Sequence, residues 1–545
     1  MKSRLFLFMA TLFVMQNVCG EDKFGQQKER WLQIAQENMP TLQKRVVEPL
    51  RVVEAVKDEK VFQGWTYKTS SFRLEDFYKT NFSSLRSITL DFGEHLTGYC
   101  TIRLKTTDRT WDAPTRLKMT FGEVPAEMNT PFDPFPGGLS RAWMQDETVE
   151  FMEVDMDREI TLPRRLSMRY LKIELLGTSS GYNFAIDKLY FTAQSSAGEV
   201  QTSLLPTCPK MFRDINEVAL STLRECMQTV FEDGPKRDHR LWIGDLYLQY
   251  LANRYSFRNY QLTKRCLYLF AGLATEKGIL ICNLFEQPKP HAQPSTYLVP
   301  YHLLYIATLL EYYRDSHDRE TALDLWPLCK VQMEDALSFV ENDIFNTSKR
   351  PAWLFFDWRE GLDVNACMQA CTIDALSNTY ALAQELGKQD EVKEYPALIR
   401  RMKAAAKKEM YDKKSGLILS GGNKQVSVLS QAWMIRAGVL NQKEGQRALR
   451  AALSHPEVVM PGTPYGTHYL VEAMLLCGMN EEAKAYVEDY WGGMVKKGAD
   501  TFWEAYDPQD DFLSPYHFAP LNSYCHAWSC TPIYFIHKYP ELFQK

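Results

Sequence analysis

The order of apolar and polar residues divides the chain into two parts with different periodicities. From about Val61 to Ser195, segments such as SITLDFGEHLTGYCTIRLK and RYLKIELLG alternate with period two and are rich in β-branched and aromatic residues. Gly, Pro, Asp and Asn clusters separate them, as between hairpin-linked strands. The pattern predicts an antiparallel β-sandwich which, with a helical lead-in, occupies residues 21–195.

A small polar stretch at residues 196–208 predicts a linker, and beyond it apolar residues recur every three or four positions. MFRDINEVALSTLRECMQTVF and YLVPYHLLYIATLLEYYRD are typical segments. About a dozen such segments in sequential pairs predict an all-α (α/α)6 toroid over residues 209–545. Because no strict repeat period is visible, an open helical solenoid is the less favoured packing.

The first twenty residues have the features of a signal peptide. A cationic start, an apolar run and tolerated residues at the minus-three and minus-one positions precede Glu21: Lys2, Arg4, Leu5 to Val14, Val18 and Gly20. The pattern predicts export to the periplasm or the extracellular space. A lipid anchor at Cys19 is less favoured, because Gln-Asn-Val precedes it instead of small apolar residues.

The composition of the chain narrows the classes of protein to which it can belong. With 545 residues, 45% hydrophobic content and a net charge of -5, the chain suits a multidomain globular protein without a nucleic-acid-binding surface. No later stretch is long and apolar enough for a membrane span. The cysteines after Cys19 are scattered, which predicts buried thiols. Cys367 and Cys371 lie four apart without a nearby partner pair, so no metal site is expected.

The stretch DGPKRDHRLWIGD, Asp233 to Asp245, concentrates charge between two predicted helices. Gly-Pro ends the first helix, and Gly-Asp precedes the second. One interpretation is a surface turn of ion pairs with Asp245 as a helix cap. The other is an active-site loop, in which crowding raises the pKa of one acid enough to keep its proton. The crowded groups are Asp233, Asp238, Asp245, Arg237, Arg240 and His239.

Three later segments carry further candidates. GADTFWEAYDP contains Glu504 beside Trp503, an acid that could act as a general base next to a sugar-stacking ring. WLFFDWREG contains Trp358, and NSYCHAWSC contains His526. For His526, a hydrogen-bonded core position is about as consistent with the sequence as a ligand contact.

These motifs, in this order behind a β-sandwich, resemble the family 78 glycoside hydrolases, the α-L-rhamnosidases. The resemblance extends from DFGEHLTGY at Asp91 to the last helix. It implies inverting hydrolysis of terminal α-L-rhamnosides on an (α/α)6 barrel, without a metal or organic cofactor. The implied partner is a rhamnosylated glycan; the oligomeric state is not implied.

The resemblance also implies residue roles. Many members have Glu where His239 stands, but shorter-spaced members align their acid with Asp238, which we prefer as general acid because it keeps a carboxyl group. Glu504 matches the general base. The implied substrate contacts are Asp233, Arg237, His239, Trp242, Asp245, Trp358, Trp503 and His526.

Two other functions fit parts of the pattern. An unsaturated glucuronyl hydrolase uses the same type of barrel, and Arg237 and Arg240 could contribute to a basic pocket for its uronate. A non-catalytic carbohydrate-binding relative is the second alternative, with His239 as the sign of lost activity.

Overall fold

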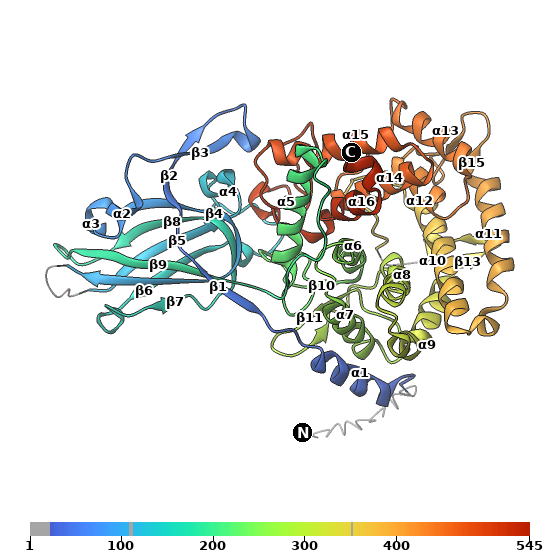
Figure 1. Ribbon diagram of the computed structural model, residues 1–545, viewed down its shortest axis with the longest axis horizontal. Helices are drawn as coiled ribbons and strands as arrows, with labels where there is room; N and C mark the ends of the chain where they lie inside the picture. Colours follow the sequence, from blue (N-terminus) through green and yellow to red (C-terminus); the bar gives the residue numbers. More distant parts are fainter. Residues whose placement is uncertain (1–21, 108–112, 350–352) are drawn as a thin grey trace, which may run out of the picture.

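The computed structural model describes residues 22–107, 113–349 and 353–545. The predicted signal peptide, including Cys19 and the cleavage site before Glu21, therefore lies outside the described residues. Figure 1 shows a β domain on the left and a helical domain on the right. The fold class predicted from the two periodicities is confirmed.

Strand β4 (Ser87–Thr106) organises the β domain because it belongs to both of its halves. Its first half pairs with β2 (Arg51–Lys57) and β8 (Leu166–Gly177), and its second half pairs with β7 (Ile160–Thr161) and β9 (Phe184–Ser195). All these pairings are antiparallel, and the remaining paired strands are β1 (Gln43–Val47), β3 (Trp65–Thr69), β5 (Thr115–Gly122) and β6 (Asp146–Phe151). The buried residues of alternate positions form one apolar core.

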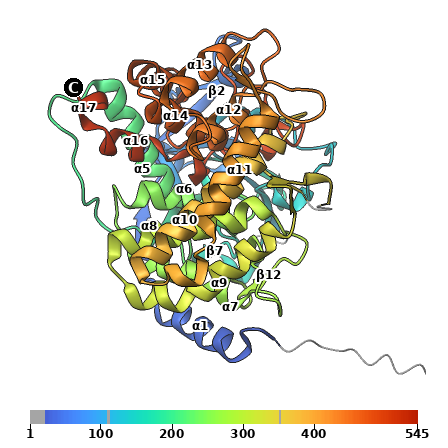
Figure 2. The same cartoon turned by 90° about the vertical axis from the view of Figure 1, so that its right-hand side faces the viewer.

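Twelve helices of the described chain alternate between an inner and an outer ring. The inner helices are α6 (Ile243–Asn253), α8 (Val299–Ser316), α10 (Asn365–Leu386), α12 (Val428–Arg436), α14 (Pro464–Leu476) and α16 (Pro532–Lys538). The outer helices are α5 (Lys210–Cys226), α7 (Tyr260–Gly272), α9 (Arg319–Leu337), α11 (Tyr395–Met410), α13 (Gln442–Leu453) and α15 (Asn480–Lys496). Successive inner helices pack on one another from α6 to α14, and α16 contacts α6. Figure 2 shows the helical domain from the end that faces away from the β domain.

The sequence of each helix explains its ring. Every residue of α6 is buried, which fits a helix that is apolar on most sides and enclosed by neighbours. In α13, QKEGQRALRAAL, the buried residues lie on one stripe, as expected for a helix with one face in solvent.

The lead-in helix α1 (Gly25–Glu37) lies against α7 of the helical domain. The prediction from sequence placed this helix with the β domain, but its contacts are with the helical domain (Figure 1). The physical reason is its apolar stripe: Trp31 is fully buried, and its Nε1 donates to Asp324 Oδ2 of α9 at 2.9 Å.

All eleven cysteines of the described residues are buried free thiols. Within the described ranges, no helix is long and apolar enough to cross a membrane, and no group of three or more His, Cys, Asp or Glu side chains could hold a metal ion.

Candidate active site

A narrow cavity lies where the loops before several inner helices meet. Its walls come from four segments far apart in the chain: the α5–α6 loop, the start of α8, the loop before α10 and the segment between α15 and α16. The lining residues are Asp233, Arg237, Asp238, Trp242, Asp245, Leu298, Tyr301, Trp353, Phe355, Trp358, Glu504, Tyr516, His526 and Trp528. Eight of the ten residues predicted for the site are therefore brought together.

The DGPKRDHRLWIGD loop has a tightly held backbone. Asp233 and Arg240 close it, because the Asp233 amide donates to the Arg240 carbonyl at 2.9 Å and the Arg240 amide donates to Asp233 Oδ1 at 3.1 Å. At Gly234, a Cβ atom would lie 2.8 Å from Ser523 Oγ, so only glycine allows the loop to approach the C-terminal segment this closely. The loop is thus buried against another part of the site and is not a surface turn.

Glu504 is buried with three hydrogen-bond donors around its carboxylate. Arg237 Nη2 donates to Oε2, Tyr516 Oη donates to Oε1 at 2.5 Å, and the Ser523 amide donates to Oε2 at 3.1 Å. Burial is the largest single influence and opposes ionisation, but Arg237, His526 and Tyr516 together outweigh it and lower the pKa of Glu504. The Glu504 side chain is therefore a carboxylate at neutral pH.

Asp238 faces Glu504 across the same guanidinium. Arg237 Nη1 lies 3.7 Å from Asp238 Oδ1, and Arg240 Nη1 lies 3.8 Å from Asp238 Oδ2. Because one guanidinium contacts both carboxylates, Asp238 and Glu504 lie within reach of a single group on the same cavity, as the two acids of a glycosidase must. The side chain of Asp238 is 16% exposed, so the cavity reaches it.

The other two aspartates of the loop are strongly buried. Burial, with repulsion from Asp238 and Asp245, raises the pKa of Asp233 well above its usual range. Burial also raises the pKa of Asp245, which lies in the first turn of α6, and repulsion from Glu504 adds to the effect. Each of these carboxyl groups is therefore protonated more readily than an exposed aspartate, and in that form it can donate as well as accept hydrogen bonds.

Three polar atoms in this cavity make no hydrogen bond within the described chain. They are Asp245 Oδ1, His526 Nδ1 and Trp358 Nε1. Burial lowers the pKa of His526 to about 4, so its ring is neutral at pH 7. Its Nδ1 lies 3.8 Å from Asp245 Oδ1. Buried polar atoms without partners are costly, and several converging on one cavity indicate a hydroxyl-rich ligand.

An aromatic wall completes the cavity. Trp242 lies edge-on to Tyr301, and Phe355 stacks on Trp528 with 6.0 Å between ring centroids. At Gly244, a Cβ atom would lie 2.3 Å from the Tyr301 ring, so this glycine lets Tyr301 reach the cavity. Tyr301, Phe355 and Tyr516 were missed from the sequence. Phe355 belongs to the WLFFDWREG segment, but Tyr301 sits in an ordinary apolar helix pattern that carries no signal of a site.

Two predicted site residues point elsewhere. His239 packs edge-on against Trp143 of the β domain, with 5.9 Å between the ring centroids, and does not line the cavity. Trp503 stacks on Phe62 at 4.1 Å and is 2% exposed. In both cases the neighbouring residue, Asp238 or Glu504, faces the cavity, and the side chain next to it is directed away. The predicted substrate contacts of His239 and Trp503 are therefore corrected to packing contacts.

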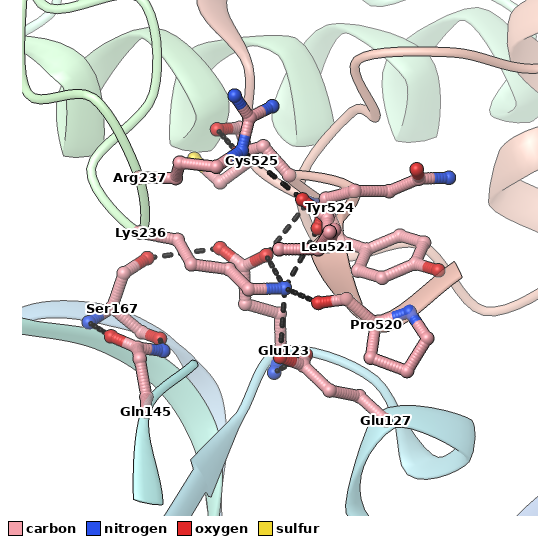
Figure 3. Close-up of polar contacts among 12 residues, drawn as sticks. Glu123, Glu127, Gln145, Ser167, Lys236, Arg237, Pro520, Leu521, Tyr524 and Cys525 are labelled. Atoms are coloured by element: carbon pink, nitrogen blue, oxygen red, sulfur yellow. Dashed lines mark hydrogen bonds and ion pairs between the residues drawn. The ribbon is translucent and has the colours of Figure 1, made fainter. Parts of the chain in front are cut away.

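A buried cluster of charged side chains joins the loop from Asp233 to Asp245 to the β domain (Figure 3). Lys236 Nζ lies 2.7 Å from Glu127 Oε1 and 3.6 Å from Glu123 Oε2, and it donates to the carbonyls of Pro520 and Asn522. Glu123 Oε2 also accepts the Tyr524 amide at 2.7 Å.

Lys236 thus ties its own loop to the C-terminal segment that contains Pro520 and Asn522. The next residue, Arg237, donates from Nε to the Leu521 carbonyl at 3.1 Å, within the same C-terminal segment (Figure 3). Two glutamates of the β domain therefore hold the segment that orients the Arg237 guanidinium between Asp238 and Glu504.

Comparison with known families identifies the class. A model described as the glycosyl hydrolase family 78 alpha-rhamnosidase N-terminal domain matches residues 49–193. A second, the bacterial alpha-L-rhamnosidase 6 hairpin glycosidase domain, matches residues 200–539. The chain belongs to the family 78 α-L-rhamnosidases and is a glycoside hydrolase. The resemblance seen in its motifs is confirmed.

Solved structures agree with this assignment. A rhamnosidase from Klebsiella oxytoca with rhamnose bound is 37% identical, with a TM-score of 0.90 over 94% of this chain and 99% of that chain. A Streptomyces avermitilis α-L-rhamnosidase complexed with L-rhamnose is 16% identical, with a TM-score of 0.63 over 91% of this chain and 44% of that chain. The second likeness shows the fold alone. A comparison with curated proteins finds no match.

Proposed function

We propose that this chain removes terminal α-L-rhamnose from glycans or glycosides by an inverting, single-displacement reaction. The observation that carries the proposal is the pair Asp238 and Glu504, which line one cavity on either side of Arg237. Asp238 gives its proton to the departing oxygen. Glu504, held as a carboxylate, takes a proton from the water that attacks the anomeric carbon from the opposite face.

The rest of the cavity suits a 6-deoxy sugar. The unpartnered atoms of Asp245, His526 and Trp358 are available to the ring hydroxyls. The apolar wall, which includes Leu298, Tyr301 and Phe355, offers a surface to the methyl group that replaces the hydroxymethyl group of an ordinary hexose.

The two rival functions are less well supported. A uronate would need an unpaired cation, yet the one Lys or Arg among the described residues lining the cavity, Arg237, is already paired with Glu504. A loss of activity through His239 is not favoured either, because His239 packs on Trp143 while Asp238 supplies a carboxyl group to the cavity.

The proposal is tested with nitrophenyl α-L-rhamnoside, using proton NMR to follow the first sugar released. We expect β-L-rhamnose to appear first and the α anomer to accumulate later by mutarotation. Initial release of the α anomer would contradict inversion. Turnover of unsaturated uronides instead of the rhamnoside would support the first rival, and sugar binding without turnover would support the second.

Removing the Arg237 charge should shift the pH dependence of activity. Because Arg237 lowers the pKa of Glu504, kcat/KM of the wild type should be lost only when the pH falls below the usual glutamate range. In Arg237→Met, the pKa of Glu504 rises, so the acidic limb of the pH profile of kcat/KM should move to higher pH. An acidic limb at the same pH in both proteins would show that Glu504 is not the group that titrates there.

We further propose that the chain is exported, with a cleaved signal peptide, to the periplasm or the extracellular space. Support comes from the cationic start at Lys2 and Arg4 and the apolar run that follows. N-terminal sequencing of the mature protein should begin at Glu21. A mature chain that begins with an acylated Cys19 would replace this proposal by a lipid anchor.

A further inference from the structure

A second, larger space adjoins the cavity and has no part in the chemistry described above. It is a groove of about 910 Å³, within the roughly 300 to 1,000 Å³ typical of small-molecule sites. Trp353 and Trp358 line both the cavity and the groove, so the two spaces adjoin at these two rings. We propose that the groove binds the leaving-group side of the substrate and that it selects a neutral glycan. The inference rests on the proposed function and names its substrate class.

The groove follows the boundary between the two domains. One wall is the segment from Asp510 to Pro520, which also supplies Tyr516 to the cavity. The β domain contributes Gln63, Ala126 and Thr130. The Gln63 amide donates to the Asp511 carbonyl and to Tyr524 Oη, both at 2.9 Å, and so fastens the two walls together. The β domain is therefore part of the binding surface beyond the scissile bond.

Aromatic side chains in this groove are unusually exposed. Trp353 is 49% exposed and Phe512 is 63% exposed. They are the two aromatic residues among the large apolar side chains that the described chain leaves in solvent, and both line the groove. Exposed aromatic faces gathered at one concave surface indicate a ligand with flat apolar faces, as the C–H faces of pyranose rings are.

The charges of the groove select against an acidic leaving group. Its described lining includes three carboxylates: Asp357, Glu360 and Asp510. The one Lys or Arg in that lining is Arg359, which donates from Nε to the Met460 carbonyl at 3.0 Å and lies 3.3 Å from Asp507 Oδ2. A uronic acid would meet net negative charge, whereas neutral hexoses meet hydrogen-bonding groups and aromatic faces.

The test compares three rhamnosides in the full-length protein and uses a polyphenol rhamnoside as a fourth, control substrate. The substrates are a neutral trisaccharide with terminal rhamnose, its counterpart with a uronic acid next to rhamnose, and nitrophenyl α-L-rhamnoside. We expect kcat/KM for the neutral trisaccharide to exceed that for the uronate by tenfold or more. Equal or better turnover of the uronate would overturn the inference, as would higher kcat/KM for a polyphenol rhamnoside, which would assign the groove to aromatic aglycones.

A variant pair tests the aromatic contact. Phe512→Ala should lower the ratio of kcat/KM for the neutral trisaccharide to that for the nitrophenyl rhamnoside by about three- to tenfold. Leu476→Ala, which also removes a half-exposed apolar side chain but lies outside the groove, should leave the ratio unchanged. An equal ratio in both variants overturns the groove assignment. If neither the wild type nor the control hydrolyses the nitrophenyl rhamnoside, the proposed function itself has failed.

Discussion

Glu504→Gln should lower kcat by about 10²- to 10⁴-fold, because an amide cannot take a proton from the attacking water. The substitution keeps the size of the side chain and an oxygen that can accept from Tyr516 Oη. The loss should therefore appear in kcat for every rhamnoside, whatever its leaving group. Steady-state kinetics on nitrophenyl α-L-rhamnoside measures it.

Glu472→Gln provides a matched control for this loss. Glu472 is also a buried glutamate paired with an arginine, Arg436, but it lies inside the helical ring and not in the cavity. Both variants leave a buried guanidinium with less compensation and should lower the thermal unfolding temperature. Only Glu504→Gln should remove activity. If both variants lose activity in proportion to their stability, Glu504 is structural and not the base.

Lys236→Met should destabilise the protein by about 3 to 5 kcal/mol, because it removes the buried cation that Glu127 and Glu123 share and leaves Glu123 with His95 as its one ion-pair partner among the described residues. Lys236 is 2% exposed, and two glutamates and two backbone carbonyls surround its ammonium group. Methionine fills a similar volume but replaces none of these interactions. Denaturant unfolding followed by tryptophan fluorescence measures the change, and kcat should fall as well, since Lys236 holds the segment that orients Arg237.

Two further variants separate lost charge pairing from lost packing. Adding Glu127→Gln to Lys236→Met removes one of the stranded carboxylates, so the double variant should be more stable than Lys236→Met alone. Lys408→Met, at a lysine whose side chain is 81% exposed, should change stability by less than about 0.5 kcal/mol. If the double variant is less stable than Lys236→Met alone, the ion cluster of Figure 3 is not the source of the lost stability.

The fold was predictable because each domain repeats a simple period. The apolar core residues of β4 all lie at even-numbered positions, and the buried residues of α13 all lie on one side of the helix. Both are properties of single segments, so the sequence carries them locally. The lead-in helix was grouped with the wrong domain because its partner surface, α7, lies more than two hundred residues further along the chain. The sequence of a helix indicates which face is buried but not what buries it.

The site residues were predictable where a cluster of charges or the order of the motifs marked them. They were less predictable where the direction of the backbone decides which side chain enters the cavity. Asp238 and His239 both have positive φ, 67° and 53°, and this turn directs one side chain into the cavity and the other toward the β domain. Their spacing alone cannot tell which is which. The role of Lys236 was equally hidden, because its partners Glu123 and Glu127 belong to the other domain.

The central claim is that Asp238 donates a proton to the leaving group, and Asp238→Asn tests it most directly. The variant is compared with the wild type on two substrates: nitrophenyl α-L-rhamnoside, whose leaving group needs little protonation, and an alkyl or sugar rhamnoside, whose leaving group needs it fully. The loss in kcat/KM should be at least tenfold larger on the alkyl or sugar rhamnoside. Equal losses on both substrates would contradict Asp238 as the general acid.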